Sequence, residues 1–360
     1  MGPTHYSQQN TVGSNGYPSS GFATGLLNAR KEHWQLGLPH YIDAQKVGSL
    51  PAIIAVGGGK GGVGKSLISA NLATCLARTG RKVLAIDFDI GGANLHTYFG
   101  MPGATSGLSD VIIGRQRQLH EVAAPTKIHG LSLVAGGGEE FWGGVEVLNT
   151  DVLRYFFDQL TLLKHNSNVD IVILDLGAGT AKYTRDLFLM SHLGLVTLLP
   201  EPTSVENVYL FLKNILLDLV ENAASHVGVV EDGRQIRKNL LATKVGHDGS
   251  KLSYYMKLME SRAHFPELVQ TISSVLASRQ FGVVVNQIRN QKDIDLGKSI
   301  ELITERYFGL STFSCGHLNY DECAWKALRN RRILLEDFPT SNIAKKFQDL
   351  ARTSLVRLGY

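Results

Sequence analysis

The stretch that decides the fold of this chain reads Gly59-Lys60-Gly61-Gly62-Val63-Gly64-Lys65-Ser66. Its spacing, G-x-x-x-x-G-K-S, is that of a loop that wraps around the phosphates of a nucleotide. An apolar run, 53–56, precedes the loop and a helix-like stretch, 65–78, follows it. The motif requires this order of strand, loop and helix, which argues against the alternative of a glycine-rich turn with an unrelated lysine.

The residue types of this loop suit a nucleoside triphosphate. Glycine has no Cβ, so the backbone curls tightly and successive N–H groups point inward. A helix that begins near Lys65 adds the positive end of its dipole. We expect Lys65 to reach the β- and γ-phosphates and the Ser66 hydroxyl to bind Mg²⁺. The predicted nucleotide-binding loop comprises Gly59, Lys60, Gly61, Gly62, Val63, Gly64, Lys65, Ser66 and Leu67.

Strand-like and helix-like runs alternate between residues 51 and 205. The predicted strands are 52–56, 82–86, 131–135, 170–174 and 194–199, and the predicted helices are 65–78 and 147–164. This alternation predicts an α/β fold, a doubly wound and mostly parallel sheet flanked by helices.

Acidic residues follow two of these strands. Asp87 and Asp89 end one apolar run, and Asp175 ends another. In a parallel α/β sheet, ligands bind at the carboxyl ends of the strands, where the phosphate loop also lies. We therefore expect Asp175 to hold Mg²⁺ through water, with Asp87 and Asp89 near the metal and the attacking water. The alternative is that these are solubilising aspartates of turns.

With these residues in place, the chain resembles the MinD/ParA superfamily of P-loop ATPases. The segment Lys60–Ser66 matches that family's deviant loop, K-G-G-x-G-K-[ST], and further matching segments are 86–95, 200–205, 283–287 and 318–322. The resemblance covers residues 51 to about 220 and about 280 to 357. The form of 175–179 and of Pro200-Glu201-Pro202-Thr203-Ser204 is most similar to the FlhG/FleN branch, which regulates flagellar number, and MinD is the near neighbour.

The resemblance implies a role for each matching residue. Lys60 corresponds to a lysine that crosses a dimer interface to the partner's phosphates, and Lys65 to the lysine of the loop itself. Asp89 corresponds to the aspartate that orients the hydrolytic water, which makes Lys60, Lys65 and Asp89 the predicted catalytic residues. The predicted metal site comprises Ser66, Asp87 and Asp175, and Asn286 corresponds to an adenine-contacting residue. Where the family usually has a proline after its last strand, this chain has Leu318-Asn319.

Composition limits the class of protein. The chain has 360 residues, 44% of them hydrophobic, enough for one large α/β domain with additions. A net charge of +4 neither demands nor excludes nucleic acid or acidic lipid. Three cysteines do not make a disulfide framework, so we expect a reducing, cytoplasmic location. A peripheral position at the inner membrane or a cell pole is the alternative.

Two regions depart from a minimal P-loop domain. Residues 1–48 are rich in Gly, Ser, Asn and Gln and are predicted to form a flexible tail before a domain spanning 49–360. Residues from about 222 to 278 are predicted to be a helical insertion, in which a polar, turn-rich stretch, 228–249, is followed by residues at helical spacing, so that we expect two extra helices with a mobile loop. Apolar residues recur at helical spacing in both proposed helices: Leu252, Tyr255, Met256 and Met259, then Leu268, Ile272, Val275 and Leu276. These stripes predict local core, with a partner-docking surface or DNA contacts as alternatives.

The end of the chain, 341–358, is helix-like with an apolar side. We expect it to dock on the core, and reversible attachment to a membrane is the alternative.

The resemblance implies an ATPase switch that dimerises with Mg²⁺ and ATP and is reset by hydrolysis, most similar to proteins that control flagellar number or placement. It implies a protein partner such as an FlhF-like GTPase. Division-site placement, chromosome or plasmid partitioning, and a nucleotide-binding scaffold with little turnover are the alternatives.

Overall fold

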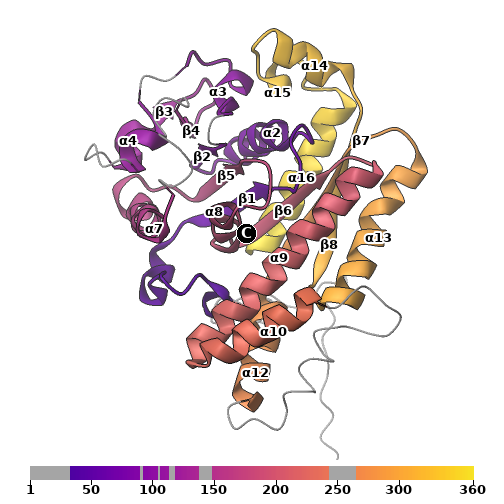
Figure 1. The fold of residues 1–360 in the computed structure, drawn as a ribbon. Helices are drawn as coiled ribbons and strands as arrows, with labels where there is room; N and C mark the ends of the chain where they lie inside the picture. The colour runs from indigo at the N-terminus through magenta and orange to yellow at the C-terminus, as the bar shows by residue number, and fades with distance from the viewer. Residues whose placement is uncertain (1–32, 90–91, 104–105, 113–117, 138–147, 243–264) are drawn as a thin grey trace, which may run out of the picture.

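In the computed structural model, the described residues are 33–89, 92–103, 106–112, 118–137, 148–242 and 265–360. They form one twisted sheet with helices on both faces (Figure 1). The strand order is β3-β4-β2-β5-β1-β6-β7-β8, and every neighbouring pair is parallel except β3 with β4. The strands are β1 (Ala52–Gly57), β2 (Val83–Phe88), β3 (Ala124–Pro125), β4 (Leu131–Val134), β5 (Ile171–Leu176), β6 (Leu193–Leu198), β7 (Phe281–Ile288) and β8 (Thr312–Asn319). The predicted α/β fold with a mostly parallel sheet is confirmed.

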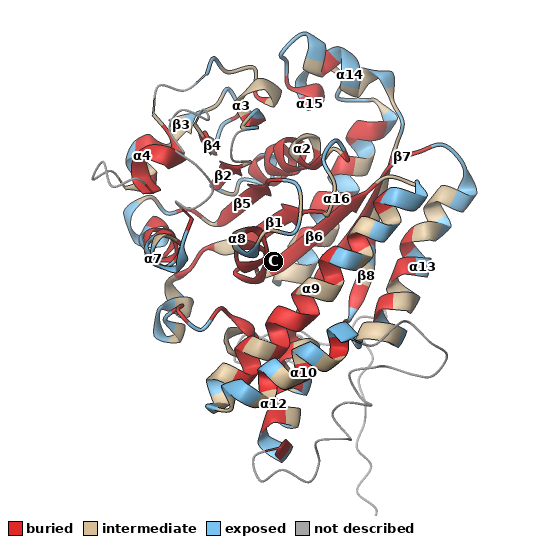
Figure 2. Ribbon diagram, in the orientation of Figure 1, coloured by how far each residue is buried: buried red, intermediate tan, exposed pale blue. Residues whose placement is uncertain are grey.

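The central strands are continuous apolar runs because both of their faces are covered. Alternate residues of β1 show this: Ile53 and Ala55 point into one core, and Ile54 and Val56 into the other. Figure 2 shows the strands buried between helices whose outer sides are exposed.

The helices divide between the two faces of the sheet. On one face, a core forms around α2 (Lys65–Arg78), α3 (Leu95–Tyr98), α14 (Glu322–Arg329), α15 (Leu334–Asp337) and α16 (Asn342–Leu358). The other face carries α4 (Leu108–Ile112), α5 (Leu119–Val122), α7 (Thr150–Asn166), α8 (Lys182–Leu189), α9 (Pro202–Val227), α10 (Val230–Ala242), α12 (Phe265–Ser278) and α13 (Gln291–Phe308). The predicted helix 65–78 coincides with α2, and the predicted strands agree with the observed ones to within two residues.

The last third of the predicted tail differs from expectation. Residues 33–49 contain two 3-10 helices, η1 (Gln35–Gly37) and η2 (Ala44–Ser49), which pack on α9, α12 and α7. Trp34 is 4% exposed, donates from its indole N–H to the Ser191 carbonyl at 2.8 Å, and stacks on His192. Burial of the aromatic side chains of Trp34 and Tyr41 fixes this segment on the core, although the composition of residues 1–48 as a whole is typical of a flexible tail. Residues 1–32 lie outside the described part.

The described parts of the predicted insertion are helical, and residues 230–242 are not the turn-rich loop that we expected. Residues 230–242 form α10, which buries Ile236 and Leu240 against α9. Figure 1 shows α10 and α12 beside α9. In α12, Leu268, Ile272 and Val275 are buried in the main core, as the predicted stripe required, whereas the stripe 252–259 lies outside the described residues.

The last helix docks on the core. Ser341 is the N-cap of α16, since its hydroxyl accepts a hydrogen bond from the Ala344 N–H at 3.3 Å. Ile343, Phe347 and Leu350 are buried against α2 and the sheet, which confirms the expected docking.

Candidate nucleotide-binding site

The site lies at the carboxyl ends of the three central strands. Strand β5 runs between β1 and β2, and its register places Asp175 beside Val56 of β1 and beside Asp87 of β2. The loop 58–64 leaves β1 at the same edge and leads into α2. Sheet order therefore brings together the loop and both acidic segments, which are far apart in the sequence.

The loop has the backbone of an anion site. Gly62 and Gly64 have φ values of +77° and +94°, which side-chain-bearing residues rarely adopt. Gly64 is the N-cap of α2 and has no side chain to cap the helix, so the first N–H groups are open to a phosphate. Val63 is buried, and Leu67 lies half-buried in the first turn, where its carbonyl accepts from the Asn71 amide.

Lys65 lies inside the loop. Its side chain is nearly buried, and its Nζ is 3.4 Å from the Lys60 carbonyl. Burial lowers the pKa of Lys65, and the nearby carboxylates of Asp175 and Asp89 partly oppose this change. A multiply charged phosphate in the loop would give this buried ammonium a direct ionic partner in addition to the long carbonyl contact.

Asp175 has the features of a metal-binding carboxylate. It is 1% exposed, its Oδ1 accepts from the Ser69 hydroxyl at 2.8 Å, and its Oδ2 has no hydrogen-bond partner among the described residues. Burial, reinforced by the charge of Asp87, raises the pKa of Asp175 to about 7, while the hydroxyls of Ser66 and Ser69 oppose the rise. An orphaned carboxylate oxygen beside a serine hydroxyl fits Mg²⁺, which prefers hard oxygen ligands.

The remaining ligands would come from outside the carboxylates. No group of three His, Cys, Asp or Glu side chains in the described ranges could hold a metal by itself. Mg²⁺ commonly keeps several waters and takes one or two carboxylates plus substrate phosphates, so the small donor set at Ser66 and Asp175 is appropriate for it.

Asp87 organises the turn after β2. Its two oxygens accept from the backbone N–H groups of Asp89, at 3.0 Å, and Leu95, at 2.9 Å. Burial raises the pKa of Asp87 to about 6, and these hydrogen bonds moderate the rise. Asp87 therefore lies next to the metal-binding candidate, but each of its oxygens already accepts a hydrogen bond from the backbone.

Asp89 stands between two loops. A Cβ at Gly177 would lie 2.9 Å from Asp89 Oδ1, and one at Gly92 would lie 3.1 Å from Oδ2. Glycine at both positions leaves room for this carboxylate, which is only partly buried. It sits at the mouth of the site, where a water could reach it.

Lys60 is held by its own chain. Its Nζ lies 3.2 Å from the Thr203 hydroxyl and 3.6 Å from Glu201 Oε2, at the start of α9. Sequence reasoning noted the segment 200–205 but did not predict this contact. The signal was the Glu and Thr that follow β6, whose carboxyl end is beside that of β1 in the sheet.

Asn286 supports the loop from the other side. It is 1% exposed, its amide N–H donates to the Val63 carbonyl at 2.8 Å, and its Oδ1 accepts from the Gln287 N–H. A Cβ at Gly64 would collide with the same amide, so Asn286 and Gly64 fit as a pair. The adenine contact implied for Asn286 stays a prediction, whereas its contact with the loop was not anticipated.

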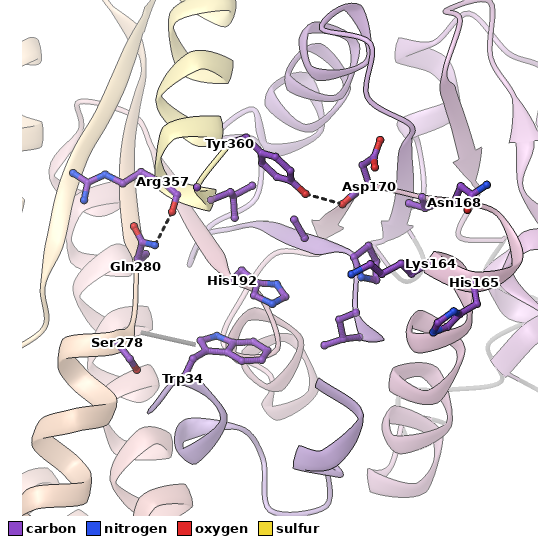
Figure 3. Close-up of a pocket in the computed structure, with 16 residues that line it drawn as sticks. Trp34, Lys164, His165, Asn168, Asp170, His192, Ser278, Gln280, Arg357 and Tyr360 are labelled. Carbon is purple, nitrogen blue, oxygen red and sulfur yellow. Dashed lines mark hydrogen bonds between the residues drawn. The ribbon is translucent and has the colours of Figure 1, made fainter. Parts of the chain in front are cut away.

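A separate cavity of about 580 Å³ opens at the amino ends of the strands, on the opposite side of the molecule from the phosphate loop. Its lining includes residues just before the starts of four strands, and Figure 3 shows Trp34, His192, Lys164, Asp170, Gln280 and Tyr360 around it. Trp34 and His192 stack there at 4.4 Å between ring centroids. Its position at the amino ends of the strands separates it from the phosphate loop.

The chain is similar to known proteins over most of its length. The model of the CobQ/CobB/MinD/ParA nucleotide binding domain matches residues 54–334. The antiactivator FleN of Pseudomonas aeruginosa is 24% identical over 302 residues, covering 83% of this chain and 85% of FleN. The flagellum site-determining protein YlxH of Helicobacter pylori is 30% identical over 211 residues, covering 58% of this chain and 69% of YlxH.

The same architecture occurs in a solved structure. The septum site-determining protein MinD of Pyrococcus horikoshii, complexed with Mg-ADP, superposes with a TM-score of 0.52 over 85% of this chain and 96% of MinD. Sequence identity is 17%, so this likeness concerns the fold alone.

Proposed function

This chain belongs to the CobQ/CobB/MinD/ParA nucleotide-binding family, and from that premise we propose that it is an ATP-hydrolysing switch that dimerises with Mg²⁺ and ATP. One observation carries the proposal: the buried Asp175 has one oxygen without a hydrogen-bond partner in the described residues, and it lies with the phosphate loop at the carboxyl ends of the strands. Such a carboxylate is costly in the empty protein, and a bound Mg²⁺–nucleotide would compensate for it.

The residues divide the work of phosphoryl transfer. The backbone N–H groups of the loop and the Lys65 ammonium bind the β- and γ-phosphates, while Ser66 and Asp175 hold Mg²⁺, which supplies charge neutralisation when bound. Asp89 orients a water for in-line attack on the γ-phosphorus as the bond to the β–γ bridging oxygen breaks. Positioning and charge, rather than covalent chemistry of the protein, lower the barrier.

Lys60 would couple this chemistry to dimerisation. Its side chain is 40% exposed, so its ion pair with Glu201 is a surface contact that contributes at most about 1 kcal/mol. Little is lost when Lys60 leaves Glu201 and extends to the phosphates of a second copy. A cation that arrives only in the dimer would make hydrolysis depend on association, as an arginine finger does in other nucleotide hydrolases.

The cellular task that we propose is control of flagellar number or placement. FleN and YlxH, the flagellar proteins to which the chain is similar, support this task. A positional protein partner, such as an FlhF-like GTPase, and a cytoplasmic location, with transient residence at the inner membrane or a cell pole, belong to the same proposal. Within the described residues, no helix has the length and apolarity to cross a bilayer.

The test is the association state of the purified full chain. Sedimentation with Mg²⁺ and ATP, with Mg²⁺ and ADP, and without nucleotide should show a dimer only with ATP, and phosphate release should rise more than linearly with protein concentration. A chain that stays monomeric and releases no phosphate at saturating Mg-ATP would refute the proposal.

Two further assays separate the cellular alternatives. ATP-dependent binding to anionic vesicles would favour division-site placement. DNA binding that falls steeply with salt would favour partitioning. Neither is expected for the flagellar role, in which ATP should instead drive capture of the FlhF-like GTPase.

A further inference from the structure

A buried ion pair joins α8 to α9 behind the nucleotide site. Arg185 of α8 and Asp218 of α9 are 8% and 1% exposed. The guanidinium of Arg185 donates two hydrogen bonds to the carboxylate of Asp218, from Nε to Oδ2 at 2.5 Å and from Nη2 to Oδ1 at 3.3 Å. Burying two charges costs several kcal/mol per ion before their attraction is counted, so a hydrophobic pair would pack here at no greater cost. Specific geometry is the best-attested use of such a pair.

The free end of Arg185 reaches the loop that follows β5. Its Nη1 donates to the Thr180 carbonyl. Thr180 is three residues beyond Gly177, where an added Cβ would lie 2.9 Å from Asp89 Oδ1, and two beyond Ala178, whose Cβ would lie 3.7 Å from a Cβ placed on Gly61 of the phosphate loop. Arg185 therefore anchors the segment 177–181, which runs close beside the water-orienting candidate and passes near the phosphate loop.

The other side of Asp218 reaches α10. Arg237 of α10 donates from Nη1 to Asp218 Oδ1 and to Glu221 Oε2, both at 3.0 Å. The side chain of Arg237 is 25% exposed, and Figure 2 shows the outer side of α10 facing solvent. One carboxylate, Asp218, thus links a helix at the surface to the arginine that anchors the loop.

A second restraint acts on the same helix. The Tyr41 hydroxyl donates to Asp186 Oδ2 at 2.8 Å, and Lys182 pairs with Asp186 one turn away. Asp186 is 1% exposed and next to Arg185. Helix α8 is therefore fixed by polar contacts from the segment before β1 and from α9. A change in the Arg185–Asp218 contact should then displace the loop 177–181 rather than the helix.

We propose that Arg185 and Asp218 are positioning residues for the loop 177–181, and that Arg237 of α10 keeps Asp218 in place for this role. The effect of the loop on ATP hydrolysis rests on the proposed function, whereas the restraint on the loop holds in the nucleotide-free chain. Among the described residues, loss of Arg237 leaves Asp218 Oδ1 with the 3.3 Å contact to Arg185, and Glu221 loses this cation. The anchor of Thr180 then loosens.

The test compares two arginines of α10 in the full chain. Arg237→Gln removes the link, and Arg234→Gln is the matched control, because Arg234 is 67% exposed and its ion pair in the described residues is with Glu231 of its own helix at 3.5 Å. Hydrogen exchange of the peptide 177–190 in nucleotide-free protein should be roughly threefold to tenfold faster in Arg237→Gln and unchanged in Arg234→Gln. Equal exchange in the two variants would overturn the coupling, whether or not the chain hydrolyses ATP.

Kinetics test the catalytic half. In Arg237→Gln, kcat should fall roughly threefold to tenfold with KM unchanged, because the segment beside Asp89 is disturbed while the phosphate loop keeps its own support from Asn286. Arg237→Lys keeps a cation beside Asp218 and should recover part of the loss. Faster exchange with an unchanged kcat in an active enzyme would overturn the positioning role. Asp218→Asn should increase hydrogen exchange and lower kcat more than Arg237→Gln does. If the Asp218→Asn variant fails to fold, the comparison of the Arg237 and Arg234 variants still tests the proposal.

Discussion

Replacing Asp175 by Asn should stabilise the protein in the absence of Mg²⁺ and nucleotide. The wild-type carboxylate is buried, has one unpartnered oxygen and lies beside Asp87 in the register of β2 and β5. Asparagine has nearly the same shape, keeps an oxygen for the Ser69 hydroxyl and carries no charge. The substitution therefore removes the cost of ionisation without opening a cavity.

The magnitude follows from the pKa of Asp175, which burial raises from 3.8 to about 7. At about 1.4 kcal/mol per pKa unit, the ionised carboxylate destabilises the folded chain by about 4 kcal/mol at pH 8. The folded state holds its proton more tightly than the unfolded state, so this penalty is absent below about pH 4 and grows until about pH 7. The free energy of unfolding should thus be about 4 kcal/mol higher in Asp175→Asn at pH 8 and about 2 kcal/mol higher at pH 5.

Urea unfolding in EDTA at pH 8 and pH 5 measures both values. Asp349→Asn is the control, since Asp349 has an exposed side chain and should change stability by less than about 0.5 kcal/mol. An Asp175→Asn chain that is no more stable than wild type at pH 8, or whose advantage does not shrink at pH 5, would refute the argument that a costly charge is kept for a metal.

Three further substitutions and a deletion test the other assignments. Lys60→Ala should bind ATP with normal affinity but lose ATP-driven dimerisation and turnover in sedimentation and phosphate-release assays; unchanged turnover would remove its role across the interface. Asp89→Ala should accumulate as an ATP-bound dimer on size exclusion, and a monomer in excess ATP would contradict this. Asn286→Ala should weaken nucleotide binding by about 1–3 kcal/mol in calorimetry, because the buried Val63 carbonyl loses its donor, and an unchanged affinity would exclude a brace. Deleting 222–278 should abolish folding, since α10 and α12 bury side chains in the main core, and a soluble deletion variant with cooperative unfolding would show a separable module.

Much of the fold could be predicted because its signals are local. The glycines at 62 and 64, the Lys65-Ser66 pair and the apolar runs that became β1, β2 and β5 act over a few residues, and so do the caps of α2 and α16. Aspartates that follow such runs were expected near the loop for the same reason, because all parallel strands end at one edge.

Contacts between distant segments could not be predicted in this way. Three contacts join residues that are more than a hundred positions apart in the sequence. They are those of Lys60 with Glu201 and Thr203, of Asn286 with Val63, and of Trp34 with Ser191. Helix α10 was not predicted because its sequence is polar. Its few apolar residues stabilise the helix only because they pack on the face of α9 that they cover.

Short-range chemistry in the chain specifies a phosphate loop, a strand or a helix, because backbone conformation and side-chain type decide these within one or two turns. Which strand lies beside which is a matter of how the two cores close around the sheet. Only the insertion of β5 between β1 and β2 brings Asp175 within reach of Ser66 and Asp87, and only the packing of α8, α9 and α10 gives Asp218 its two arginines.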